Sequence, residues 1–168
     1  MSTVPRSVQP NHTVQPNHTV QPTQTTQLPR LAPVTDDPDT GGFFAAAAAG
    51  QVVLRYCADC GALLHLPRAY CYHCGSWNTG YRVVAPQARV YSWTVVEHQI
   101  HPAYPVPYTV ALVELADEPA ARLISFLPGR PDLYAGQELH AWFEQLADGS
   151  TLVQWRTADR ELPLGEVS

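Results

Sequence analysis

The chain has 168 residues, which is enough for one domain of ordinary size or for a small domain carrying a metal module. Its 10 basic and 15 acidic residues give a formal net charge of −5, whereas proteins that neutralise nucleic-acid phosphates normally carry a basic surplus. No apolar run approaches the roughly 18 residues of a membrane-spanning helix, and the first residues lack the layout of a signal peptide. Composition therefore disfavours general nucleic-acid binding and predicts a cytoplasmic protein.

Residues 1–38 are rich in Pro, Gln, Thr and Asn, and the hexamer Val-Gln-Pro-Asn-His-Thr occurs at 8–13 and again at 14–19. Such a sequence cannot bury enough apolar surface to offset the entropy lost on ordering. We predict a disordered N-terminal tail that does not pack on the folded part and can be deleted without loss of folding.

Residues 39–56 predict a docking segment made of a short helix and a strand. Five alanines follow Phe43 and Phe44 and precede Gly50, so we expect a helix over about 42–49 with a glycine cap. The two phenylalanines are expected to dock this helix onto the rest of the protein. Residues 51–56 have the β-branched and aromatic content of a strand.

Residues 81–157 contain five β-branched and aromatic runs separated by Pro, Gly and Asp, which predicts a mainly β fold. The runs are 89–98, 108–115, 121–127, 138–146 and 151–156. Short strands at this spacing are typical of a small barrel, and the turn residues between them support the count. Residues 158–168 predict a loose C-terminal tail.

All four cysteines lie in two Cys-x-x-Cys pairs, each followed by a glycine, with ten residues between the pairs. Two thiolates separated by two residues can hold one metal ion when the backbone curls into a knuckle, and the glycine permits the tight turn. Four sulfurs complete a tetrahedron and leave no open coordination position. The pattern predicts one structural zinc ion in a ribbon over residues 57–80, with the ligands Cys57, Cys60, Cys71 and Cys74.

Two alternatives to this zinc site remain at the level of sequence. Iron competes because rubredoxin uses similar knuckles, usually with a longer separation between them. His65 and His73 have the chemistry to replace a cysteine ligand, but with four cysteines present we expect them beside the site or at the surface.

The motifs follow one another in an informative order: an aromatic pair on a short helix, a glycine and a strand, the ribbon, and then the barrel strands. The residues are Phe43-Phe44, Gly50, Val52-Val53-Leu54, Cys57 to Gly75 with Pro67-Arg68 between the knuckles, Ser76, Val90 to Val96, Pro107 to Leu115, Gly136, Leu139 and Phe143-Glu144. From Phe43 to Arg156 the chain thereby resembles the zinc-ribbon and OB-fold proteins that accompany acyl-CoA enzymes, formerly a domain of unknown function numbered thirty-five.

The resemblance implies a rubredoxin-like zinc ribbon followed by a five-stranded OB-fold barrel. It also implies an accessory subunit that pairs with a thiolase, a lipid-transfer-type aldolase of sterol side-chain breakdown or a hot-dog hydratase. Such a subunit helps to hold or transfer an acyl-CoA bound through the partner. Two departures from the family pattern, His65-Leu66 and Tyr72, remove no metal ligand.

Residue content gives weak support to independent catalysis. His98, His101 and His140 have no nucleophile or paired carboxylate in a recognised motif, and the sequence has no Gly-rich phosphate loop. We therefore expect most of the chemistry to belong to a partner chain.

The alternative function is single-strand nucleic-acid binding. An OB barrel with a ribbon is frequent in such proteins, and Tyr91, Trp93 and Tyr108 have rings on which bases can stack. The acidic balance argues against this alternative.

The segment from His98 to Tyr108 is the predicted partner surface. Its three prolines limit its freedom in advance, so docking costs less ordering entropy, and tyrosine is common at interfaces. The opposing interpretation is a stiff connection packed on its own barrel. The residues predicted to contact the partner or the acyl-CoA are Arg68, Ile100, Tyr104 and Tyr108.

Overall fold

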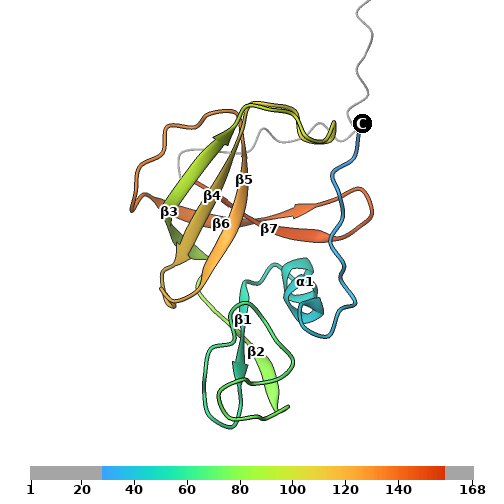
Figure 1. Ribbon diagram of the computed structural model, residues 1–168, viewed down its shortest axis with the longest axis vertical. Coiled ribbons are helices and arrows are strands. Elements are labelled where there is room, and N and C mark those ends of the chain that lie inside the picture. The colour runs from blue at the N-terminus through green and yellow to red at the C-terminus, as the bar shows by residue number, and fades with distance from the viewer. Residues whose placement is uncertain (1–27, 158–168) are drawn as a thin grey trace, which may run out of the picture.

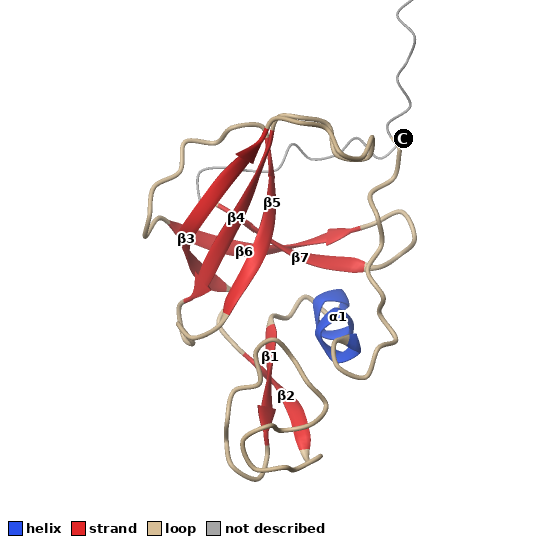
Figure 2. Ribbon diagram, in the orientation of Figure 1, coloured by secondary structure: helices blue, strands red, loops and turns tan. Residues whose placement is uncertain are grey.

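The computed structural model describes residues 28–157, which contain one helix and seven strands. In chain order the elements are α1 (Gly41–Ala48), β1 (Val53–Cys57), β2 (Thr79–Val83), β3 (Gln87–Val96), β4 (Tyr108–Leu115), β5 (Arg122–Pro128), β6 (Glu138–Gln145) and β7 (Thr151–Arg156). Strands dominate the molecule (Figure 2), so the predicted mainly β fold with a short N-terminal helix is confirmed.

Five strands form one antiparallel sheet in the order β5-β4-β3-β6-β7, and this sheet is the predicted barrel. β4 alternates half-buried and buried residues along its whole length, as expected for a strand with one face on a core. β3 carries a bulge between Val90 and Ser92, which bends it so that one end pairs with β6 while most of it pairs with β4. Among the described residues, Trp155 is the largest fully buried side chain of the core.

The two edge strands of this sheet, β5 and β7, meet without a backbone ladder, and side chains bridge the seam instead. Gln154 accepts a hydrogen bond from the Phe126 N–H through Oε1 at 3.0 Å. In return, Ser125 Oγ accepts one from the Trp155 N–H at 3.1 Å. Because buried backbone donors need partners, these side chains close the barrel where the ladder is missing.

The ribbon is a second, smaller unit built on the β1 and β2 pair, which lies below the barrel in Figure 1. The register runs from Val53 opposite Val83 to Cys57 opposite Thr79, so β1 carries the first cysteine directly into its knuckle. The sequence did not predict β2, because its Thr-Gly-Tyr-Arg-Val run has no clear alternation and depends on pairing with β1. β2 also crosses the expected boundary between residues 80 and 81.

Helix α1 packs against strands of both units, β6 and β7 of the barrel and β1 of the ribbon. Its C-terminus is closed by hydrogen bonds from the Gly50 N–H to Ala47 O and from the Gln51 N–H to Ala46 O, both 2.9 Å, as expected for a glycine cap. Ala47 and the start of the following strand, Val52 and Leu54, are buried in the same core as the barrel residues. The docking helix therefore belongs to the barrel core, although the chain enters the ribbon directly after it.

Residues 28–38 differ from the disordered tail that was predicted for residues 1–38. This stretch, the N-terminal arm, runs past the β6–β7 hairpin down to α1 (Figure 1). Arg30 forms a salt bridge with Glu144, and its guanidinium carbon lies 4.5 Å from the ring centre of Phe126. The expectation that residues up to 38 do not pack on the barrel is therefore wrong for the arm. The rest of that tail, residues 1–27, and the C-terminal tail, residues 158–168, lie outside the described residues.

Candidate metal centre

The four cysteine sulfurs form one cluster at the tip of the ribbon, where all of them lie within 4.8 Å of one another. The Sγ atoms of Cys57 and Cys74 are 3.5 Å apart, and those of Cys60 and Cys71 are 3.7 Å apart. Tetrahedral zinc with Zn–S bonds of about 2.3 Å places sulfurs about 3.8 Å from one another. The cluster thus has the size of a zinc–sulfur tetrahedron.

Two knuckles of the same design build this cluster. In the first, the Cys57 N–H donates to Ala62 O at 2.9 Å, and the Gly61 N–H donates to Cys57 O at 3.0 Å. In the second, the Cys71 N–H donates to Ser76 O at 2.8 Å, and the Gly75 N–H donates to Cys71 O at 2.9 Å. Both glycines have a positive φ, 74° and 78°, which side chains with a Cβ rarely adopt.

Electrostatics show why this cluster needs a cation. The backbone N–H of Cys60 lowers the pKa of the Cys57 thiol to about 7, which favours its thiolate form. The N–H of Ser76 acts in the same sense on Cys74, but the Cys57 and Cys60 sulfurs outweigh it and raise the pKa of Cys74 to about 12. A second negative charge is unfavourable so close to the first. Four thiolates are therefore stable together only around a metal dication, and these residues fit one structural zinc ion.

A polar contact that the sequence analysis missed joins the two knuckles from outside. Asp59, inside the first pair, accepts hydrogen bonds from Ser76 Oγ and from Asn78 Nδ2, the latter at 2.7 Å. These bonds, the Ser76 bond first, hold the pKa of Asp59 below its usual range. The only signal in the sequence was an acidic residue between two cysteines, which indicates nothing until the second knuckle is placed opposite it.

Neither histidine of the ribbon belongs to the cluster. His65 Nε2 lies 2.7 Å from Arg122 O, so His65 connects the ribbon loop to the start of β5. The His73 ring stacks on Tyr72 at a centroid distance of 4.4 Å. Since four sulfurs fill a tetrahedron, the site has no open coordination position, and a closed site stabilises the fold without activating water.

The predicted partner residues differ in their exposure. Ile100 is 83% exposed at the tip of its loop, and Arg68 is an exposed ribbon residue paired with Asp39 at 3.4 Å. Tyr104 and Tyr108 are half-buried and pack on Phe126, with ring centroids at 5.9 and 5.3 Å. The two tyrosines thus contact their own barrel, which is the packing that the opposing interpretation predicted for this loop.

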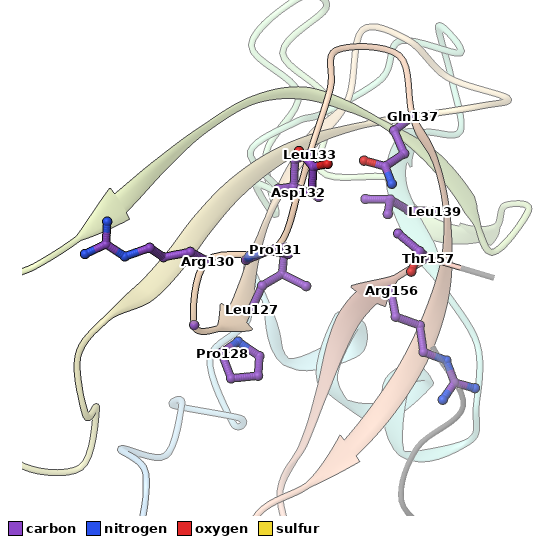
Figure 3. A pocket seen from close by; sticks show the side chains of 11 residues that line it. Leu127, Pro128, Arg130, Pro131, Asp132, Leu133, Gln137, Leu139, Arg156 and Thr157 are labelled. Atoms are coloured by element: carbon purple, nitrogen blue, oxygen red, sulfur yellow. The ribbon is translucent and has the colours of Figure 1, made fainter. Parts of the chain in front are cut away.

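A cavity of about 400 Å³ lies at the C-terminal ends of β5 and β7. Leu127, Leu133 and Leu139 line it, and Figure 3 shows the Arg130 and Arg156 side chains extending away from each other. Arg130 forms a salt bridge with Glu97 at 2.7 Å. The two cations do not converge on one point, so the cavity is poorly suited to a phosphate-bearing ligand.

Together, the ribbon with its four-sulfur site and the five-stranded barrel define a zinc-ribbon and OB-fold protein. Residues 44–78 match the family model for the ChsH2 rubredoxin-like zinc ribbon domain, and residues 81–144 match the model for the ChsH2 C-terminal OB-fold domain. One chain of the solved Ltp2-ChsH2(DUF35) aldolase is 33% identical, with a TM-score of 0.67 over 75% of this chain and 99% of that chain. The protein belongs to the ChsH2, or DUF35, family, and the expected family is confirmed.

Two further proteins are similar to this chain. The "Probable enoyl-CoA hydratase alpha subunit" of Thermomonospora curvata is 37% identical over 128 residues, which are 75% of this chain and 36% of that protein. The chain therefore spans about a third of the length of this curated relative. A DUF35 protein of Sulfolobus solfataricus has 19% identity and a TM-score of 0.48 over 64% of this chain and 78% of its own.

No helix among residues 28–157 combines the length and the apolar character needed to cross a lipid bilayer.

Proposed function

We propose that the protein is a zinc-binding accessory subunit of an acyl-CoA enzyme and helps to hold or transfer the acyl-CoA. The observation that carries this proposal is the 33% identity with almost the whole of one chain of an aldolase described as Ltp2-ChsH2(DUF35). The hydratase subunit of Thermomonospora curvata supports the same class of enzyme. The partner is a thiolase, a lipid-transfer-type aldolase or a hot-dog hydratase, with a role in lipid or steroid degradation.

The metal site indicates which subunit carries out the reaction. Because the four sulfurs leave no coordination position for substrate or water, zinc supports the fold and the reaction takes place in the partner. Ile100 and Arg68 are the residues of the predicted partner surface that remain accessible, while Tyr104 and Tyr108 act by holding the loop in place. Four reduced cysteines also favour a cytoplasmic location, which cell fractionation tests.

Co-expression tests the proposal. The full chain is produced with each candidate enzyme of the same organism, one thiolase-type, one aldolase-type and one hydratase-type. Complex formation is measured by size-exclusion chromatography with light scattering, and turnover of an acyl-CoA is compared with and without this subunit. We expect a stable complex with one enzyme and a higher activity of that complex. Separate elution from every candidate at micromolar concentration contradicts the proposal.

The nucleic-acid alternative is less well supported. The guanidinium of Arg122 lies 3.6 Å from the ring centre of Tyr91, so one of the predicted stacking platforms is already occupied. A titration with short single strands at low salt, where electrostatic binding is strongest, tests this alternative directly.

A further inference from the structure

An apolar groove runs along the outside of the seam between β5 and β7. It consists of two adjoining cavities of about 540 and 170 Å³ that share four lining residues, Phe43, Phe44, Leu66 and Leu123. We call this combined feature the seam groove. Its walls come from α1, the ribbon loop between the knuckles, β5 and β7, so it lies where the ribbon meets the barrel.

The groove exists because its two edge strands do not share a ladder. Gln154 and Ser125 accept hydrogen bonds from backbone N–H groups across the seam, but the backbones of β5 and β7 do not pair with each other. Helix α1 covers one side of this gap, and Phe43 and Phe44 form part of the wall with their rings edge to face at 5.5 Å. The aromatic pair therefore has a second role, since it lines a surface as well as docking the helix.

Two large aliphatic side chains of the groove are exposed to solvent. Leu66 on the ribbon loop is 73% exposed, and Ile124 on β5 is 70% exposed. Single exposed apolar residues are normal, but two of them on one continuous apolar groove mark a binding surface. Leu66 and Ile124 approach the groove from different units, so an occupant would contact the ribbon and the barrel at once.

The charges around the groove indicate what kind of occupant it takes. Arg122 is paired with Glu114 at 3.1 Å, and Arg30 is paired with Glu144. Arg55 donates to the backbone oxygens of Pro38 and Asp39 and to Thr79 Oγ1. Each arginine that lines the groove is therefore engaged within the chain, so none is left to neutralise phosphates such as those of coenzyme A. The complement of this surface is apolar and uncharged.

We propose that the seam groove is the docking site for an uncharged apolar segment of the partner acyl-CoA enzyme. This inference rests on the proposed function, and it places the main contact on the seam groove instead of on the loop around Ile100. An apolar side chain of the partner enters between Phe43, Phe44 and Leu66, and the segment continues along β5 past Ile124. Docking in this position holds the ribbon and the barrel in one orientation relative to the enzyme.

The test compares three substitutions of the same kind, Leu66→Asp, Ile124→Asp and Ile100→Asp. All three sites are at least 70% exposed, so a carboxylate there leaves the core intact, and zinc content and melting temperature verify this. Affinity for the partner that the co-expression experiment identifies is measured by biolayer interferometry. We expect Leu66→Asp and Ile124→Asp each to weaken binding by tenfold or more, roughly the effect of losing a hot-spot residue, and Ile100→Asp to change it little. If Leu66→Asp does not fold, Ile124→Asp alone decides.

Other results overturn the inference. Unchanged affinity of both groove variants, with loss of binding in Ile100→Asp, assigns the contact to the loop and leaves the proposed function intact. Binding of octanoyl-CoA, but not of coenzyme A, by the isolated chain and its loss in Leu66→Asp assigns the groove to a small ligand. A dimer of this chain that Leu66→Asp dissociates assigns it to a second copy. If the wild-type chain binds none of the candidate enzymes, the proposed function fails and the docking site fails with it.

Discussion

The ribbon and the barrel are stabilised by different kinds of interaction. The buried core of the ribbon consists of Leu64 and two of the four metal ligands, Cys57 and Cys71. The barrel has a cluster of fourteen buried residues, Trp155 among them, and this cluster extends into α1 and the start of β1. Because so small an apolar core cannot offset the entropy of ordering the knuckles, the ribbon depends on zinc and the barrel does not. Strand β1 belongs to both units, since Leu54 is buried in the barrel core and Cys57 belongs to the four-sulfur cluster.

The largest effect is expected from breaking the metal site. Cys71→Ser and Cys60→Ser should each lower the zinc content from one ion per chain toward zero, since zinc contributes on the order of 10 kcal/mol to the folding of such modules. Hydrogen exchange should show loss of protection at Cys57 but retained protection at Val113, which pairs with strands on both sides in the barrel sheet. Cys71 is buried and Cys60 is exposed. Equal effects therefore indicate loss of the metal, whereas a defect in Cys71→Ser alone would mean that cysteine packing, not zinc, holds the ribbon.

The complementary experiment destabilises the barrel core and leaves the metal ligands unchanged. Trp155→Ala removes the largest fully buried side chain and should cost about 3–5 kcal/mol, the usual range for such a core truncation. The melting temperature of the barrel should fall while the zinc content of the protein stays near one per chain. Tyr134→Ala, at a 65% exposed aromatic residue, is the control and should melt like the wild type. Loss of zinc in parallel with the barrel would show that the two units fold as one.

The sequence predicts the elements whose signals are local. The doubled Cys-x-x-Cys-Gly pattern predicted the metal ligands, and the β-branched runs predicted five barrel strands within a few residues. What it missed depends on residues far apart in the chain. Strand β2 exists because β1 pairs with it, and Arg30 contacts Glu144 across 114 positions. The seam groove could not be predicted either, because its four walls come together only when the ribbon loop lies beside β5.

The seam between β5 and β7 is the next place to test the barrel. Gln154→Leu keeps most of the side-chain volume but leaves the Phe126 N–H without its acceptor and removes the 3.0 Å hydrogen bond to Glu144. Leaving a buried donor unpaired should cost about 2 kcal/mol, measured by urea unfolding. Gln145→Leu, at an exposed position at the end of β6, is the matched control and should be close to neutral. If both variants unfold like the wild type, water satisfies the seam and the bridging role of Gln154 is wrong.

The smallest effect concerns the N-terminal arm and tests whether it belongs to the barrel. Arg30 carries a salt bridge to Glu144 and stacks on Phe126, with side-chain exposures of 18% for Arg30 and 21% for Glu144. Arg30→Ala should therefore lower stability by about 1 kcal/mol, or about 3 °C in melting temperature. Arg89→Ala breaks a salt bridge whose partners are 62% and 75% exposed, and it should have almost no effect because water screens such a pair. Deletion through residue 38 should lower stability at least as much as Arg30→Ala, because it also removes the Pro38 oxygen that accepts a hydrogen bond from Arg55, and deletion through residue 27 should not. If the longer deletion melts like the full chain, the arm contributes nothing to the barrel and the original prediction of a dispensable segment up to residue 38 stands.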